Sequence, residues 1–169
     1  NIPGEKELTG RGVSYCATCD GWFFKGKKVV VVGGGDSALE EAIFLTRFAS
    51  SVTIIHRRDE LRAGAILQRR AMENEKINFI WSSIPLEVLG KDSVQGLRLQ
   101  NLNTGEESTF EADGVFIFIG HTPNTQIFST QLELVNGFIT IDNRMQTSEP
   151  GVFAAGEVAD PQFKQVVVS

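Results

Sequence analysis

Residues 27–48, K-K-V-V-V-V-G-G-G-D-S-A-L-E-E-A-I-F-L-T-R-F, decide the fold. The apolar, β-branched run at 28–32 is typical of a buried strand, and three consecutive glycines follow it. From Asp36 to Phe48 the apolar residues recur at helical spacing. The stretch therefore predicts a strand, a tight glycine turn and a helix that folds back onto the strand.

The same alternation of strand and helix continues after this stretch. Residues 52–56 and 77–81 are further apolar runs of strand length. Residues 63–73 between them predict a second helix, whose inner stripe is Ile66, Leu67 and Ala71. Short connections between alternating strands and helices favour a parallel sheet. We expect a Rossmann-like α/β domain with helices on both faces of the sheet.

The pattern changes beyond residue 85. Three short segments, 86–89, 94–102 and 107–112, are separated by turn residues and predict an antiparallel β-meander in place of another crossover helix. Residues 114–119 form a further apolar run, which should return to the parallel sheet.

We expect three parts along the chain. Residues 1–12, with two glycines beyond Pro3-Gly4, read as an inter-domain linker, and the main domain covers residues 13–123. Residues 124–169 have candidate strands at 138–141 and 152–155 but are too short to bury a core alone. We interpret them as an incomplete segment of a second α/β domain.

Composition narrows the classes of partner. The chain has 169 residues and a net charge of −5, which disfavours nucleic acid or an anionic membrane as the main partner. No apolar run approaches the roughly 18 residues that a membrane span needs. The first residues lack the basic and apolar regions of a secretory signal. We expect a cytoplasmic protein.

The glycine turn reads as a dinucleotide site. Gly33-Gly34-Gly35-Asp36-Ser37-Ala38 is a G-x-G-x-x-A pattern that directly follows a strand and opens a helix. Gly33 would make the tight turn, Gly35 would let the backbone approach a pyrophosphate, and Ala38 would let the helix pack closely on the sheet. The pyrophosphate would lie at the helix N-terminus, where N–H groups favour an anion. The alternative is a glycine-rich turn without a ligand.

The second predicted strand ends in basic residues rather than in an acidic residue. NAD sites usually place an acid here for the ribose hydroxyls, but this chain has His56-Arg57-Arg58, with Arg62 one turn later. Guanidinium groups would bind the 2′-phosphate of NADPH, and each charge-assisted bond contributes about 1.5–3 kcal/mol. The site therefore predicts NADPH rather than NADH; the alternative is a solvated basic turn.

The only cysteines lie close together in Cys16-Ala17-Thr18-Cys19-Asp20. Such a pair closes a loop too short to constrain the unfolded chain much. The two histidines lie far along the chain, so a zinc site lacks ligands and no metal is expected. A redox dithiol is the favoured interpretation, with two inert buried cysteines as the alternative. Asp20 adjoins the pair and could exchange the proton that disulfide exchange must move, although it could also be an ordinary turn residue.

Together these sites resemble low-molecular-weight thioredoxin reductases. The resemblance covers nearly the whole chain; it also includes the segments 12–14, 120–124 and 151–156. It implies that NADPH reduces FAD, that the flavin reduces the Cys16–Cys19 disulfide, and that the dithiol reduces thioredoxin. Cys19 would face the flavin, Cys16 would attack thioredoxin, and Asp20 would be the acid–base residue. Arg57, Arg58 and Arg62 would hold the 2′-phosphate.

The resemblance also implies a set of cofactor contacts in the last part of the chain. Ile119 and Gly120 fall in a cofactor-binding segment of the family. Gly156-Glu157 stands where the family usually has Gly-Asp, and Lys164-Gln165-Val166 stands where it has Arg-Gln-Ala, both at the FAD. The family's N-terminal FAD segment has no counterpart here. We therefore expect this chain to bind NADPH but to hold FAD weakly or not at all, and to be inactive alone.

Two alternatives remain open. Related flavoproteins reduce a peroxiredoxin or a glutaredoxin-like protein instead of thioredoxin. A different class would be a module that senses NADPH and regulates a partner, although such a sensor needs no dithiol. The family's dimer is built largely through its FAD domains, so we expect a dimeric parent protein and a monomer for this chain.

Overall fold

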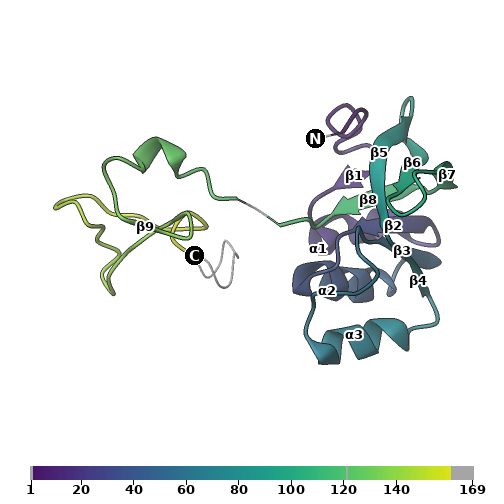
Figure 1. The fold of residues 1–169 in the computed structure, drawn as a ribbon, viewed down its shortest axis with the longest axis horizontal. Helices are drawn as coiled ribbons and strands as arrows, with labels where there is room; N and C mark the ends of the chain where they lie inside the picture. The colour runs from purple at the N-terminus through teal and green to yellow at the C-terminus, as the bar shows by residue number, and fades with distance from the viewer. Residues whose placement is uncertain (1, 121, 161–169) are drawn as a thin grey trace. The chain divides into compact units, whose positions relative to one another are not determined.

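The computed structural model describes residues 2–120 and 122–160 of the chain. It divides into two compact units, and the division falls between Ile119 and Gly120, close to the expected boundary at 123. Figure 1 shows the secondary structure of both units. None of the helices in these ranges is both long and apolar enough to cross a membrane.

Unit 1 is built on a parallel sheet of five strands in the order β1-β8-β2-β3-β4. The strands are β1 (Val13–Ser14), β2 (Lys28–Val32), β3 (Ser51–Ile55), β4 (Ile77–Ile80) and β8 (Gly114–Ile117). The predicted strands at 28–32, 52–56, 77–81 and 114–119 are all present, within two residues at each end. Because every neighbouring pair is parallel, the carboxyl ends of all five strands lie along one edge of the sheet.

One face of this sheet is covered by helices (Figure 1). They are α1 (Ala17–Asp20) with the following 3-10 turn η1 (Gly21–Phe24), α2 (Asp36–Leu45) and α3 (Ala65–Met72). The helix predicted at 36–48 stops at Leu45, because the chain tightens there: the N–H of Arg47 bonds the carbonyl of Phe44, three residues back. On α3, Ala71 is buried as expected, whereas Ile66 is 62% exposed and does not belong to the inner stripe.

The opposite face is covered by the antiparallel sheet of β5 (Ser83–Gly90), β6 (Val94–Asn101) and β7 (Glu107–Glu111). The predicted meander is therefore present. The expectation of helices on both faces is corrected, since the helices cover one face and the meander covers the other. Strand β2 shows why both faces need a cover: Val29 and Val31 pack under the helices, and Val30 and Val32 pack under the meander.

The N-terminal segment folds onto unit 1. Residues 2–12 form a series of turns, and within them the side chains of Glu5 and Leu8 are buried. The segment is bonded to the meander, because the N–H of Val88 donates to the carbonyl of Pro3 at 2.9 Å and that of Val94 to Arg11 at 3.0 Å. The segment interpreted as a linker is thus bonded to unit 1 near both of its ends.

Unit 2 has little regular structure in its described residues. It contains the 3-10 turn η2 (Gln126–Phe128) and a hairpin of β9 (Leu134–Val135) and β10 (Phe138–Ile139). The predicted strand at 138–141 is shorter than expected, and the one at 152–155 is reduced to a single bridge between Phe153 and Gln146. Asn136 and Gly137 both have positive φ, as the tight two-residue turn between the hairpin strands requires.

Candidate functional site

The predicted redox pair lies directly after strand β1, at the start of α1. Cys16 and Cys19 are joined by a disulfide, with their Cα atoms 5.3 Å apart. Cys16 is the N-cap of α1, and its sulfur accepts the backbone N–H of Cys19 at 3.2 Å. The hydroxyl of Thr18 lies 3.3 Å from the same sulfur. Cys16 is half-buried and Cys19 is exposed, so the pair is open to a reaction partner.

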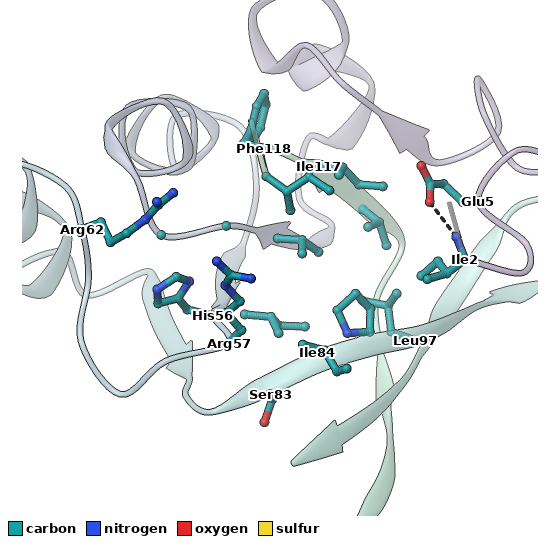
Figure 2. A pocket seen from close by; sticks show the side chains of 17 residues that line it. Ile2, Glu5, His56, Arg57, Arg62, Ser83, Ile84, Leu97, Ile117 and Phe118 are labelled. Atoms are coloured by element: carbon teal, nitrogen blue, oxygen red, sulfur yellow. Dashed lines mark hydrogen bonds between the residues drawn. The ribbon is translucent and has the colours of Figure 1, made fainter. Parts of the chain in front are cut away.

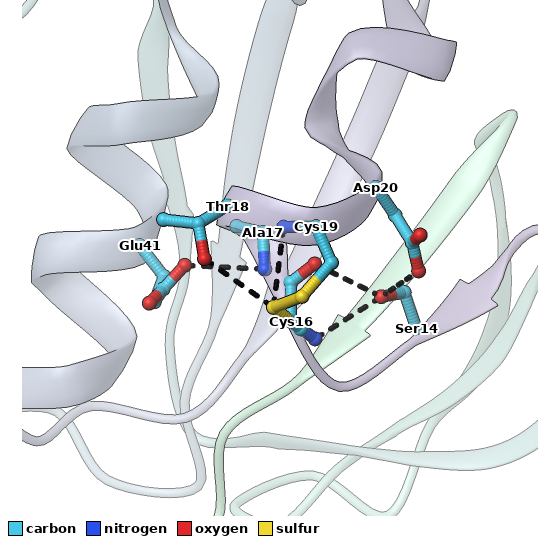
Figure 3. The surroundings of a disulfide bond; sticks show 7 residues. All are labelled: Ser14, Cys16, Ala17, Thr18, Cys19, Asp20 and Glu41. Carbon is cyan, nitrogen blue, oxygen red and sulfur yellow. Dashed lines mark hydrogen bonds between the residues drawn. A yellow bond between two sulfur atoms is a disulfide. The ribbon is translucent and has the colours of Figure 1, made fainter. Parts of the chain in front are cut away.

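Asp20 is held beside this pair by Ser14. The buried hydroxyl of Ser14 donates to Oδ2 of Asp20 at 2.7 Å, and its oxygen accepts the N–H of Cys16 at 3.1 Å (Figure 3). One serine on β1 therefore connects the candidate acid–base carboxylate with the backbone of the first cysteine. Ser14 is not recognisable as a site residue from the sequence, because its importance depends on this three-way contact.

A second carboxylate that sequence reasoning missed reaches α1 from α2. Oε2 of Glu41 accepts the N–H of Ala17 at 3.2 Å (Figure 3). Burial raises the pKa of the Glu41 carboxyl above its ordinary value, and the bond from Ala17 opposes that rise. The role of Glu41 depends on the approach of α2 to α1, which residue spacing in the sequence does not reveal.

The glycine turn has the close packing that its pattern predicts. Gly33 has a φ of 147°, and a side chain there would collide with the carbonyl of Phe118. A side chain on Gly34 would collide with the imidazole ring of His56. Gly35 is the N-cap of α2, and no described side chain caps this helix. The N–H groups of the first turn of α2 are therefore available to an external acceptor, as an anion site requires.

Two residues of the turn are occupied with the protein itself. Ala38 is fully buried against the sheet, as predicted. Oδ1 of Asp36 accepts the N–H of Gly64 at 2.7 Å, which ties the start of α2 to the residue that precedes α3. Asp36 therefore helps to fix the conformation of the turn. Ser37 is exposed in the first turn of the helix.

A cavity of about 400 Å³ opens at the carboxyl ends of β2, β3 and β8 (Figure 2). Of the predicted cofactor residues, six line it: Gly33, Gly34, His56, Arg57, Arg62 and Ile119. Figure 2 shows His56, Arg57 and Arg62 gathered at one end of the cavity and Glu5 with Ile2 at the other. Gly35, Asp36, Ser37, Ala38 and Arg58 do not line it; they belong to the adjoining turns.

The arginines make this end of the cavity strongly positive. Arg57, Arg58 and Arg62 are all exposed, and within the described residues none of them forms an ion pair. The N–H of Arg62 donates to the carbonyl of Gly34 at 2.8 Å, which joins the basic turn to the glycine turn. His56 is buried with its Nε2 lacking a hydrogen-bond partner in the described structure. Burial and then the charges of the arginines lower the pKa of His56.

The remaining predicted residues lie at the start of unit 2 and in its last part. Gly120 has a φ of 98° and is exposed. Gly156 has a φ of 85°, and its carbonyl accepts the N–H groups of Ala159 and Asp160, which form a turn around the exposed Glu157. The predicted residues Lys164, Gln165 and Val166 lie outside the described residues. No three metal-binding side chains gather within the described ranges.

Comparison with known proteins relates the chain to disulphide oxidoreductases that use a pyridine nucleotide. The family model described as pyridine nucleotide-disulphide oxidoreductase matches residues 1–169. The thioredoxin reductase of Bacillus subtilis (strain 168) is 53% identical over 171 residues, which are 99% of this chain and 54% of that protein. The bifunctional thioredoxin reductase/thioredoxin of Mycobacterium leprae (strain TN) is 51% identical, and the match covers 99% of this chain and 37% of that protein.

Solved structures agree with these relatives. The structure of Lactococcus lactis thioredoxin reductase superposes with a TM-score of 0.84 at 48% identity, over 99% of this chain and 56% of that chain. That of Streptococcus pyogenes MGAS5005 gives a TM-score of 0.85 at 47% identity, over 99% of this chain and 55% of that chain. The chain spans about half the length of most of these relatives. On its sequence and its fold alike, this chain belongs to the pyridine nucleotide-disulphide oxidoreductase family.

Proposed function

We propose that this chain is the NADPH-binding and disulfide-bearing part of a flavoprotein reductase that transfers electrons from NADPH to thioredoxin. One observation carries the proposal. A single compact unit holds both a disulfide and a glycine turn flanked by arginines that have no ion pair among the described residues. The similarity to thioredoxin reductases supports the same function. In this scheme residues 13–123 are the NADPH domain and residues 124–169 are part of the FAD domain.

The residues at the cavity fit NADPH. The glycine turn offers backbone N–H groups to a pyrophosphate. The turn can adopt this conformation because it has no side chains at Gly33 and Gly34, where a side chain would collide with neighbouring atoms. The guanidinium groups of Arg57 and Arg62 line the cavity, with Arg58 adjoining them, and they would hold the 2′-phosphate. When bound, NADPH would supply an electron pair as hydride, which FAD would carry to the Cys16–Cys19 disulfide.

The residues around the disulfide handle protons and sulfur. Reduction of the Cys16–Cys19 bond takes up two electrons and two protons and yields two thiols. Asp20, held by the hydroxyl of Ser14, is the carboxylate placed to supply or accept a proton. After reduction the N–H of Cys19 would stabilise a thiolate at Cys16, which supports Cys16 as the nucleophile toward thioredoxin. Cys19 would then be the sulfur that faces the flavin.

FAD belongs to the function of the longer protein. Glu157 offers a carboxylate on an exposed turn, where it would accept a bond from a hydroxyl of the flavin's ribityl chain. Ile119 and Gly120 would also contribute to cofactor binding, as would Lys164, Gln165 and Val166. We propose that this chain alone binds NADPH but not FAD with useful affinity. We also propose a dimeric parent protein located in the cytoplasm.

A substrate panel tests the proposal. The full-length protein is given NADPH or NADH as donor and purified thioredoxin, peroxiredoxin or glutaredoxin-like protein as acceptor, and nucleotide oxidation is followed by absorbance. We expect fast turnover only with NADPH and thioredoxin. Faster turnover with one of the other acceptors would mean that this acceptor, and not thioredoxin, is the protein substrate. Nucleotide binding without turnover on any acceptor would favour a sensing module and contradict the proposal.

A further inference from the structure

Helix α2 connects the two functional turns of unit 1. Its first turn adjoins the glycine turn, and its sixth residue, Glu41, reaches the first residue of α1. Figure 3 shows the Glu41 side chain extending from α2 toward Ala17 and Thr18. The contact joins residues 24 positions apart in the chain, and it is made by a half-buried carboxylate. Neither the nucleotide site nor the disulfide chemistry described above uses this carboxylate.

The carboxylate is bonded to the backbone of the residue next to Cys16. Ala17, which donates its N–H to Glu41, directly follows Cys16, and Cys16 in turn accepts the N–H of Cys19. In the reduced protein the start of α1 would therefore face two anions, the Glu41 carboxylate and a Cys16 thiolate. A negative charge near a thiol disfavours its ionisation. Ionised Glu41 should thus make Cys16 a weaker acid and restrain its reactivity.

We propose that Glu41 is a positioning residue for the redox pair: it holds the first turn of α1 through Ala17, and its charge sets the reactivity of the Cys16 thiol. This inference rests on the proposed function only in taking the reduced Cys16 as the nucleophile. Glu41 need not touch a substrate or cofactor. It acts through the backbone that carries Cys16.

Other groups around α1 contribute to the same field. Asp20 on α1 is bonded to Ser14, and Cys19 is the partner thiol. Glu40 stands beside Glu41 on α2, and its charge further raises the pKa of Glu41. Tyr15, next to Cys16, donates its hydroxyl to Glu5 at 2.8 Å. Each of these groups is unchanged in a Glu41 variant, so a comparison of variants isolates the contribution of Glu41.

Thiol alkylation as a function of pH tests the proposal. The 169-residue chain is reduced chemically, treated briefly with iodoacetamide across a range of pH, and digested, so that labelling at Cys16 and Cys19 is read separately by mass spectrometry. The variants are Glu41→Gln, which removes the charge and keeps a hydrogen-bond acceptor, and Glu41→Ala, which removes both. Glu75→Gln, at an exposed carboxylate in the turn after α3, is the matched control.

The predicted result is a shift at Cys16. In Glu41→Gln the midpoint of Cys16 labelling should fall by about half a pH unit or more relative to the wild type and to Glu75→Gln. In Glu41→Ala the same fall should come with slower re-formation of the disulfide, because α1 also loses its anchor. Coincident Cys16 profiles in Glu41→Gln and wild type would overturn the proposal, whatever Glu41→Ala does.

The assay separates this proposal from the proposed function. It contains no nucleotide, flavin or thioredoxin, so a negative result would leave the reductase proposal unaffected. Conversely, a full-length protein that fails to reduce thioredoxin would contradict the proposed function while the Cys16 shift could still be present. Circular dichroism of each variant shows whether its fold is retained. Glu41→Gln keeps the hydrogen-bond acceptor, so its labelling profile is the result that decides the test.

Discussion

Two strand-to-helix turns at the same edge of one sheet have opposite chemistry. The turn after β2 consists of glycines, and what it offers is backbone N–H groups and nearby guanidinium groups. The turn after β1 is rich in side chains, with a disulfide, a serine and two carboxylates in contact with it. In the proposed function, the same position in the fold would bind an anionic ligand in one case and would carry out electron and proton transfer in the other. The turn after β2 excludes side chains, whereas the turn after β1 brings several of them together.

The largest expected effect is a complete loss of thioredoxin reduction that leaves nucleotide binding at the other turn intact. In the full-length protein, Cys16→Ser together with Cys19→Ser should abolish thioredoxin reduction, because neither sulfur of the pair remains to carry the electrons. NADPH affinity of the same variant, measured by calorimetry, should stay within about twofold of the wild type, since serines leave the charges at the other turn unchanged. A large loss of NADPH affinity would show that the two turns are not independent.

Arg57→Ala should weaken NADPH binding by about tenfold to a hundredfold, the equivalent of one charge-assisted bond. NADH binding should change little, because NADH lacks the 2′-phosphate. Titration calorimetry with both nucleotides measures this difference. Arg11→Ala, at an exposed arginine in the N-terminal segment, is the control and should affect neither nucleotide. Equal losses for NADPH and NADH would mean that Arg57 contacts a part common to both.

Alanine substitutions of the neighbouring glycines Gly34 and Gly35 should affect stability and nucleotide binding differently. Gly34→Ala should lower the free energy of unfolding by about 1–3 kcal/mol, because the new methyl group collides with the ring of His56. Gly35→Ala has room within the folded chain and an ordinary backbone conformation, so it should affect stability much less. It should instead weaken nucleotide binding by blocking the approach of the pyrophosphate. Urea unfolding and calorimetry distinguish the two effects; equal stability of both variants would contradict the close packing of Gly34 on His56.

The smallest effect concerns His56 and acid. Its pKa is lowered in the folded chain, so between the folded and unfolded pKa values the unfolded chain binds more protons. The stabilising contribution is therefore complete above the unfolded value near 6.5 and is lost as the pH falls through the lower folded value. Urea unfolding from neutral to acidic pH should show a shallower decline in His56→Gln than in the wild type. Parallel curves for the variant and the wild type would show that His56 does not contribute to the loss of stability in acid.

Most of unit 1 could be predicted from the sequence because the signals there are local. Apolar runs, glycines and helical spacing identify β2, α2 and β3 without reference to the rest of the chain. The features that could not be predicted depend on tertiary contacts. Strand β1 has only two residues, and it is defined by its pairing with β8. The second cover of the sheet is the meander, and apolar spacing alone does not say on which face an element packs.

The candidate sites divide in the same way. The glycines, the arginines and the two cysteines follow from residue type and spacing, and the structure brings six of the predicted cofactor residues to one cavity. Ser14 and Glu41 could not be found from spacing. Serines and glutamates are ordinary surface residues, and only the approach of β1 and α2 to α1 gives these two a role.

In the proposed function, the turn after β2 and its arginines select NADPH over NADH. Calorimetric titration of this 169-residue chain with NADPH and with NADH, in the same buffer and salt, measures that selectivity. We predict that NADPH binds tightly and that NADH binds at least about tenfold more weakly, as expected when guanidinium groups bond a 2′-phosphate. Equal affinities would contradict the assignment of the arginines. Binding of neither nucleotide to a chain that is folded by circular dichroism would contradict the assignment of the whole turn.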